Sequence, residues 1–374
     1  MRCLSIRTVL SPLEWRQFFA FPAELYRDDP CWVPVLARDE EERVGFRRHP
    51  FHEVNCMQAF LAERGGQVVG RIAAIHNVMH NRRHGERRGF FGFFECRDDA
   101  QAARALVGAA ADWLAKHGLT DLRGPMSPSI DYLPGILVDG FDEAPSFMMP
   151  YNPSYYSKLL AECGLRKTQD LYALSSSREQ ASEALPRLSR VKQRLIDRHQ
   201  ISFRGLDRRR FHDDLTSFLS VVNRSLDGHW GHVPLSPAET DHVARGLRWL
   251  LISELALFAE VDQEPIGVAL ALPDYNPCIK RSGGRLFPCG LLRLLAAKRR
   301  IKRLRVVAAN ALPQWQRSGI GPAMIAALLE AALQRGAEHI EFSWIAESNE
   351  LSHGTLENLG ARRTKVYRVY DASL

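Results

Sequence analysis

Long hydrophobic runs, paired cysteines and a recognisable leader are missing from this sequence of 374 residues. No apolar run approaches the roughly 18 residues that a membrane-spanning helix requires. The first 19 residues are interrupted by Arg7, Pro12, Glu14 and Arg16, a pattern that argues against a secretory signal peptide. The seven cysteines form no CxxC pair. We therefore expect a cytoplasmic protein with reduced thiols, without a disulfide framework and without a metal site.

Acidic residues are scarce in one part of the chain. Residues 1–175 carry 21 Lys or Arg and 22 Asp or Glu, so the net charge of +7 comes from the rest of the chain. Residues 280–305 contain ten Lys or Arg and no acid. This asymmetry favours a polyanionic ligand or partner for the second half. The alternative is an ordinary solvated charged face.

The composition is that of a folded protein, and the length predicts two domains, possibly three. A set of elements recurs in the same order in both halves. In each half a hairpin, a buried strand, a helix ending at Gly, a short strand, a second helix ending at Gly and a closing strand are predicted, at residues 60–75, 89–95, 99–117, 120–123, 155–165 and 166–174, and again at 255–273, 305–312, 320–335, 339–345, 351–361 and 363–370. The pattern predicts a mixed α/β sheet in each of two lobes, residues 1–175 and 205–374, joined by a linker at 176–204.

Two details of this repeat concern single residues. Each hairpin has a branched residue followed by Gly near the start of its second strand, Val69-Gly70 and Ile266-Gly267. In the strand of the first half, strict alternation would place Phe91 and Phe93 on one face and Phe90 and Phe94 on the other.

The most specific motif is Gln316-x-x-Gly319-x-Gly321, between a predicted buried strand and a helix. Small residues at this position allow the backbone to approach a ligand closely. The unpaired amides of the first helical turn, together with the helix dipole, form a suitable cradle for a pyrophosphate. The motif is neither a Walker sequence nor a Rossmann GxGxxG. A plain glycine-rich turn is the alternative.

With this motif, and with Asn349 opening the next helix and Leu359-Gly360-Ala361 closing it, the sequence resembles the GNAT superfamily of acyl-CoA-dependent N-acetyltransferases. The strings FFGFFE and SWIAESN are similar to those of a two-lobed bacterial subgroup. The resemblance implies tandem duplicated acyltransferase lobes with acetyl-CoA or another acyl-CoA as co-substrate. It implies that the CoA is bound by residues of the second lobe: Leu312, Gln316, Arg317, Ser318, Gly319, Ile320, Gly321 and Asn349.

The catalytic groups are less well defined. An amine acceptor needs a base, and Glu347 follows the strand that should end near the thioester. Glu347 would equally suit the N-terminus of the next helix. The family often has a tyrosine as general acid four residues before the Gly that ends this helix, but here that residue is Leu356.

The matching loop of the first lobe, residues 96–100, has no GxG and contains Asp98 and Asp99. Carboxylates would repel a pyrophosphate. We therefore expect the first lobe to have lost nucleotide binding, with one CoA bound per chain.

The resulting prediction is direct acyl transfer to a small-molecule or peptide amine. Acyl transfer to a hydroxyl, transfer of an aminoacyl group from tRNA, and a non-catalytic acyl-CoA sensor or structural two-lobed protein remain alternatives. The basic stretch keeps nucleic acid possible as a partner, without favouring it.

About 32 residues separate the strands that flank this stretch, and an amphipathic helix is predicted near Gly290–Arg300. It could bind the 3′-phosphate of CoA, or present a basic face to an anionic acceptor or a membrane surface, and we favour the second use.

Overall fold

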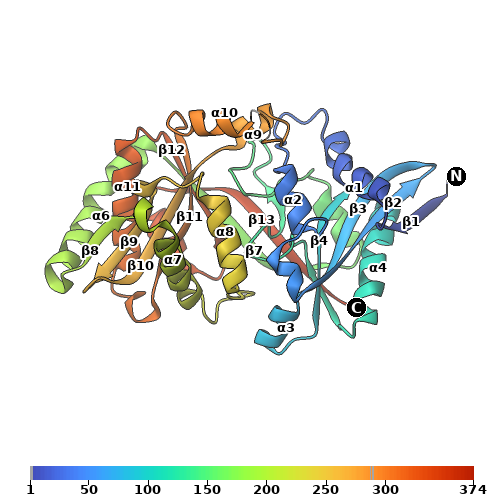
Figure 1. The fold of residues 1–374 in the computed structure, drawn as a ribbon, viewed down its shortest axis with the longest axis horizontal. Coiled ribbons are helices and arrows are strands. Elements are labelled where there is room, and N and C mark those ends of the chain that lie inside the picture. The colour runs from blue at the N-terminus through green and yellow to red at the C-terminus, as the bar shows by residue number, and fades with distance from the viewer. Residues whose placement is uncertain (1–2, 287, 289) are drawn as a thin grey trace. The chain divides into compact units, whose positions relative to one another are not determined.

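The computed structural model describes residues 3–286, 288 and 290–374, which fold into two compact units (Figure 1). The first unit comprises Met1–Leu171, Ile279–Gly290 and Lys365–Leu374, and the second comprises Tyr172–Cys278 and Leu291–Thr364. The units are thus interleaved in sequence, and each is described separately below.

The first unit is a mixed sheet with helices on both faces. Its strand order is β1-β2-β3-β4-β5-β13-β7, and β6 also pairs with β13. Its elements are β1 (Leu4–Thr8), α1 (Pro12–Leu25), α2 (Ala37–Arg43), η1 (Pro50–Glu53), β2 (Cys56–Arg64), β3 (Gln67–His76), α3 (Val78–His84), β4 (Arg88–Cys96), α4 (Ala100–Lys116), β5 (Asp121–Gly124), β6 (Ile136–Asp139), α5 (Tyr156–Glu162), the start of β7 (Arg166–Ser177) and most of β13 (Arg362–Ser373).

Alternate residues of β2 supply the two cores of this unit. Phe60 and Ala62 pack with α4, whereas Ala59 and Leu61 pack with Phe18 of α1. The sheet is therefore the middle layer of three.

The second unit has the strand order β7-β12-β11-β10-β9-β8. Its elements are the end of β7, α6 (Arg178–His199), β8 (Ser202–Gly205), η2 (Arg208–Arg210), α7 (Phe211–Ser225), α8 (Pro237–Leu247), η3 (Ser253–Leu255), β9 (Ala256–Val261), β10 (Glu264–Pro273), the start of α9 (Asn276–Arg281), α10 (Gly290–Ala297) from Leu291 onward, β11 (Arg303–Ala311), η4 (Pro313–Trp315), α11 (Ile320–Gln334), β12 (His339–Ala346) and α12 (Glu350–Glu357). Helices α6 and α11 share one core with the sheet.

The structure confirms the repeat. The hairpins β2–β3 and β9–β10 are each followed by a strand, a helix and a parallel neighbour of that strand. Close packing explains why both hairpins have a glycine near the start of the second strand. A Cβ on Gly70 would lie 2.7 Å from Leu106 of α4, and a Cβ on Gly267 would lie 2.9 Å from Ile320 of α11. Each glycine lets the helix approach its sheet closely.

The expected division at residues 175 and 205 differs from the one observed. Residues 365–374 belong to the first unit because β13 pairs there with β5, from Tyr370–Gly124 to Ser373–Asp121. Much of the expected linker is the helix α6, which starts with a capping box between Ser177 and Gln180. Leu188 and Leu195 of α6 are buried in the second unit's core.

The predicted alternation in β4 is wrong at one point. Phe93 has a positive φ of 52°, and the pairing with β3 shifts register between Arg71 and Ala73. Beyond this bulge the side chains change faces, so Phe91 and Phe94 lie in one core and Phe93 in the other.

In the part of the chain that the structure describes, no helix is long and apolar enough to cross a membrane. The same residues contain no group of three or more His, Cys, Asp or Glu side chains arranged to hold a metal ion.

Candidate active site

The loop between β11 and α11 is held by its own hydrogen bonds. The Leu312 amide donates to Ile266 O at 2.9 Å, and the Trp315 amide donates to Leu312 O at 2.8 Å. The Ser318 amide and hydroxyl both donate to Trp315 O, at 3.1 and 2.7 Å. The Gln316 side chain donates to Ser225 O at 3.1 Å. Leu312, Gln316 and Ser318 therefore shape the loop, and the Leu312 and Ser318 amides are already bonded within the chain.

The three residues after Ser318 form an open helix start. Gly319 is the N-cap of α11 with φ of 95°, in the left-handed region that favours glycine, and no side chain caps the helix. Among the described residues, nothing accepts a hydrogen bond from the amides of Gly319, Ile320 and Gly321. A Cβ on Gly321 would meet nothing within 4 Å, whereas a Cβ on Gly319 would lie 3.3 Å from Val191 of α6. Such a helix start suits an anionic ligand.

The loop lies where two parallel strands separate. β11 pairs with β12 over four residues only, from Arg303–His339 to Val306–Phe342. Beyond Val306, β11 continues to Ala311 against β10 alone, with a register shift at Leu270–Ala271. An edge of β11 from residue 307 to 310 is therefore left without a strand partner in the described chain. The family resemblance predicts Leu312 as a CoA-binding residue, whereas no sequence pattern points to residues 307–310.

Glu347 and Asn349 are brought to the same edge of the sheet as the loop, because β11 and β12 run parallel and both end there. Glu347 directly follows β12 and is partly exposed. Asn349 caps α12, since its Oδ1 accepts from the Ser352 amide at 3.2 Å. Leu356, at the position of the family's tyrosine, is 3% exposed in the core.

A buried polar network stabilises the two strands just before they separate. Arg305 Nε donates to Ser343 Oγ at 2.8 Å, and Arg305 Nη2 donates to Ser343 O at 3.0 Å. The Ser343 hydroxyl in turn donates to Glu341 Oε1 at 2.6 Å. All three residues are at most 4% exposed. Arg305 belongs to the basic stretch of the sequence, but in the structure its side chain positions β12 below the site.

The first unit fills the corresponding places with its own groups. Asp99 caps α4, and its Oδ1 accepts from the amides of Gln101 and Ala102 at 3.1 and 3.0 Å. Arg64 pairs with the same carboxylate at 2.9 Å. Beyond the last pair of β4 with β5, Phe90–Arg123, the Phe93 amide donates to Ser127 Oγ at 2.8 Å. A Cβ on Gly92 would lie 1.7 Å from Met126 O, so the chain there is packed against β4.

Known proteins resemble this chain in sequence. The model of the Acetyltransferase (GNAT) family matches residues 227–361, which include the loop and α11. The chain is 32% identical over 375 residues to Protein YghO of Escherichia coli K12, covering 99% of this chain and 95% of that protein. It is also 32% identical over 380 residues to Bacterial ceramide synthase of Caulobacter vibrioides, covering 99% of this chain and 98% of that protein.

Solved structures share the fold at low identity. A tandem GNAT protein from the clavulanic acid biosynthesis pathway superposes with a TM-score of 0.56 at 14% identity, covering 99% of this chain and 98% of that one. A GCN5-related N-acetyltransferase from Sphaerobacter thermophilus superposes with a TM-score of 0.55 at 11% identity, covering 99% of this chain and 95% of that one.

The chain therefore belongs to the GNAT family, as a two-lobed member with duplicated lobes, and it is an acyltransferase. Enzymes of this family use an acyl-CoA as co-substrate.

Proposed function

We propose that this protein transfers a long acyl chain from acyl-CoA, bound in the second unit, to the amino group of a long-chain amino alcohol. The open start of α11 supports the acyl-CoA site. The acceptor class rests on the relative named Bacterial ceramide synthase, which matches 99% of this chain. A ceramide is the amide of a fatty acid and a long-chain amino alcohol, so its synthesis is an N-acylation.

In this proposal, the amides of Gly319, Ile320 and Gly321 donate to the pyrophosphate, with the exposed Arg317 side chain as an additional cation. The pantetheine arm follows the open edge of β11 at residues 307–310, where the strand lacks a partner on the side of β12. Asn349, which caps α12 at the same edge, lies toward the thioester end.

The reaction is a single nucleophilic displacement. The neutral amine nitrogen attacks the thioester carbonyl carbon, an N–C bond forms, and the C–S bond breaks. The amine loses one proton to Glu347, and the CoA thiolate takes one proton from water, because the family's general-acid position holds the buried, apolar Leu356. Glu347 is proposed as base because it follows β12 at the edge where the loop and α12 begin.

The test uses the whole chain with palmitoyl-CoA and sphinganine in detergent micelles. We expect an amide product, identified by mass spectrometry, together with one equivalent of free CoA per amide. We expect at least tenfold slower transfer from acetyl-CoA. Binding of CoA without an amide over a panel of long-chain amines would contradict the proposed reaction and favour an acyl-CoA sensor.

A matched pair of variants tests the site itself. Gly321→Val adds a branched side chain beside the α11 amides, where a Cβ meets nothing within 4 Å, and it should weaken CoA binding at least tenfold by calorimetry. Gly108→Val in α4 is the control, because a Cβ there also meets nothing within 4 Å. Equal CoA affinities in the two folded variants would place the pyrophosphate elsewhere.

A further inference from the structure

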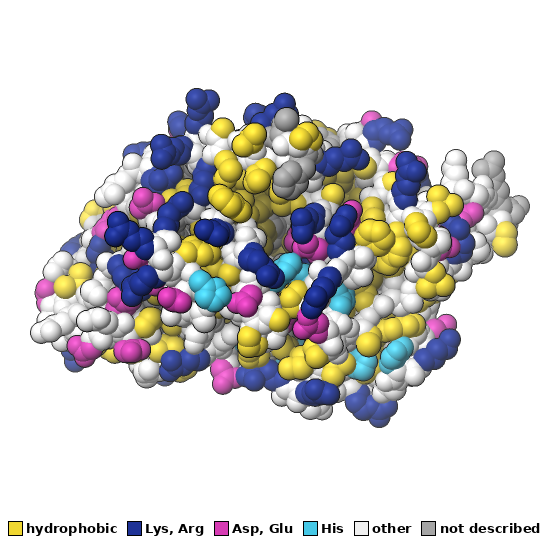
Figure 2. All heavy atoms as spheres, viewed as in Figure 1, with side chains coloured by type: hydrophobic (Ala, Val, Ile, Leu, Met, Phe, Trp, Pro, Cys, Tyr) yellow, Lys and Arg dark blue, Asp and Glu magenta, His cyan; other side chains and the backbone are white. Residues whose placement is uncertain are grey.

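The segment from α10 to the start of β11 combines positive charge with exposed apolar surface. Residues 291–305 contain seven Lys or Arg and no acid. On α10, Leu294 is 1% exposed and anchors the helix, while Leu292 is 68% exposed. Figure 2 shows hydrophobic side chains bordered by Lys and Arg over this helix. The predicted amphipathic helix is thus confirmed as α10, with an apolar residue on its outer side.

A second exposed apolar side chain is held next to the end of α10 in the same unit. Lys298 Nζ donates to the carbonyl of Trp249 at 2.9 Å and also to the carbonyl of Leu251. Arg208 Nη2 donates to Leu251 O at 3.3 Å. The Trp249 ring is 55% exposed, with the guanidinium of Arg248 5.7 Å from its centre. Two cations therefore fix the loop that presents this tryptophan.

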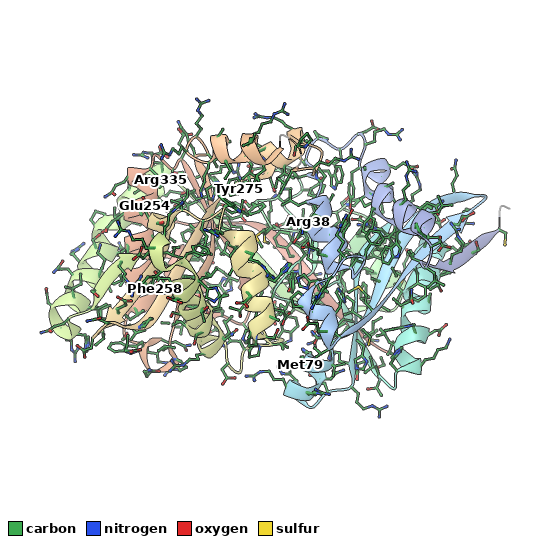
Figure 3. The ribbon with its side chains drawn as sticks, viewed as in Figure 1. Arg38, Met79, Glu254, Phe258, Tyr275 and Arg335 are labelled. Atoms are coloured by element: carbon green, nitrogen blue, oxygen red, sulfur yellow. The ribbon has the colours of Figure 1, made fainter. Side chains whose placement is uncertain are left out.

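The charge around these two side chains is predominantly positive. Burial, together with the nearby Arg208 and Arg335, lowers the pKa of Lys298 to about 8, against the opposing effect of Glu254. Figure 3 labels Glu254 and Arg335 in this part of the second unit. The carboxylate of Glu338 is paired with Lys302. The cations Arg293, Arg299 and Arg300 are exposed.

We propose that this surface, defined by Trp249, Leu292, Arg293, Arg299 and Arg300, docks the enzyme on an anionic lipid bilayer. Exposed Leu and Trp side chains insert at the boundary between headgroups and acyl chains. The cations then contact anionic headgroups, each contributing about a fivefold gain in binding. A nucleic acid would use the cations alone and would leave the apolar side chains in water. Charge and apolar exposure together therefore favour a membrane over a nucleic acid.

Docking requires no acyl transfer, so it is tested separately from the proposed function. The whole chain is sedimented with vesicles of phosphatidylglycerol and phosphatidylcholine, or of phosphatidylcholine alone, at 0.1 M salt. We expect binding to the anionic vesicles only, weakening as salt rises. Leu292→Ser and Trp249→Ser should each weaken binding at least fivefold. Arg299→Gln with Arg300→Gln should weaken it at least tenfold and flatten its salt dependence.

Leu351→Ser is the matched control. Leu351 on α12 is 67% exposed, close to the value for Leu292, but Glu350 and Glu357 lie on its helix. Its vesicle affinity should stay within twofold of the parent chain. Equal loss in Leu292→Ser and Leu351→Ser, or equal binding to neutral vesicles, would overturn the proposal. Binding to tRNA that Leu292→Ser leaves unchanged, with no vesicle binding, would assign the surface to nucleic acid instead.

Discussion

The helices α4 and α11 occupy equivalent places in the two units, yet their N-termini differ in chemistry. α4 begins at Asp99, whose carboxylate accepts from two amides of the first turn and pairs with Arg64. α11 follows its N-cap residue Gly319, and no side chain caps its first turn. The carboxylate of the first unit occupies the place that a pyrophosphate is proposed to take in the second. This difference is the reason why we expect no CoA at the first unit.

The strands before the two helices differ in the same way. In the first unit the bulge at Phe93 has its amide bonded to Ser127 Oγ, and Met126 packs against Gly92. In the second unit, within the described residues, β11 has no strand partner beyond Val306 on the side of β12. Because the first unit satisfies its own backbone at both places, we propose that the second unit carries the chemistry.

Introducing the first unit's carboxylate into the second should have the largest effect. Gly319→Asp is expected to weaken CoA binding at least about 100-fold, about 3 kcal/mol, because the carboxylate repels the pyrophosphate and competes for the same amides. Gly319→Asn is the control, since Asn tolerates a positive φ and has the same shape without the charge. Calorimetry showing equal CoA affinities for the two variants would refute the charge argument.

The next largest effect should be a loss of stability at low pH that is confined to the first unit. In the first unit, burial lowers the pKa of His80 from 6.5 to about 4, so the folded state keeps this side chain neutral. Below pH 6.5 the unfolded chain binds a proton that the folded chain does not, so stability falls as pH falls toward 4. The linkage amounts to about 2 kcal/mol between pH 7 and pH 5.

Hydrogen exchange at pH 7 and pH 5, corrected for intrinsic rates, measures this loss separately in each unit. We expect β3, α3 and β4 around His80 to lose more protection than β10 and β11. His80→Gln should remove most of the difference, and an unchanged pH response in that variant would show that another group is responsible.

Removing the cap of α4 should have a smaller effect. Asp99→Ala leaves two first-turn amides without an acceptor and is expected to lower the free energy of unfolding by about 1 kcal/mol in urea. Asp98→Ala is the neighbouring control, because Asp98 is exposed and caps no described helix. Equal losses in the two variants would contradict the capping role.

The smallest expected effect is on CoA stoichiometry. Replacing both Asp98 and Asp99 by Ala should leave one CoA per chain, because Ser127 and Met126 still occupy the edge of β4 in the first unit. Calorimetry that shows two equivalent sites in this variant would mean that the carboxylates alone block the first unit.

Some features follow from local sequence and were predictable without a structure. The period of apolar residues and the terminal glycines placed α4 and α11 within a few residues, and the order of elements revealed the repeat. The uncapped start of α11 follows from Gly319 and Gly321, since glycine offers no side chain to satisfy the helix amides. These properties depend on residues that are close together in the chain.

Other features depend on residues far apart in the chain, and only the tertiary structure decided them. The pairing of β13 with β5 in the first unit joins segments about 250 residues apart, and no periodic pattern specifies the partner. The bulge at Phe93 reversed the expected faces of β4 because it depends on pairing with β3. Likewise, only the fold shows that the Leu312 amide is already bonded to Ile266 O. Hydrogen bonds between distant strands leave no local signal, so the sequence determined the elements and their order, whereas the fold decided which backbone groups remain open to a ligand.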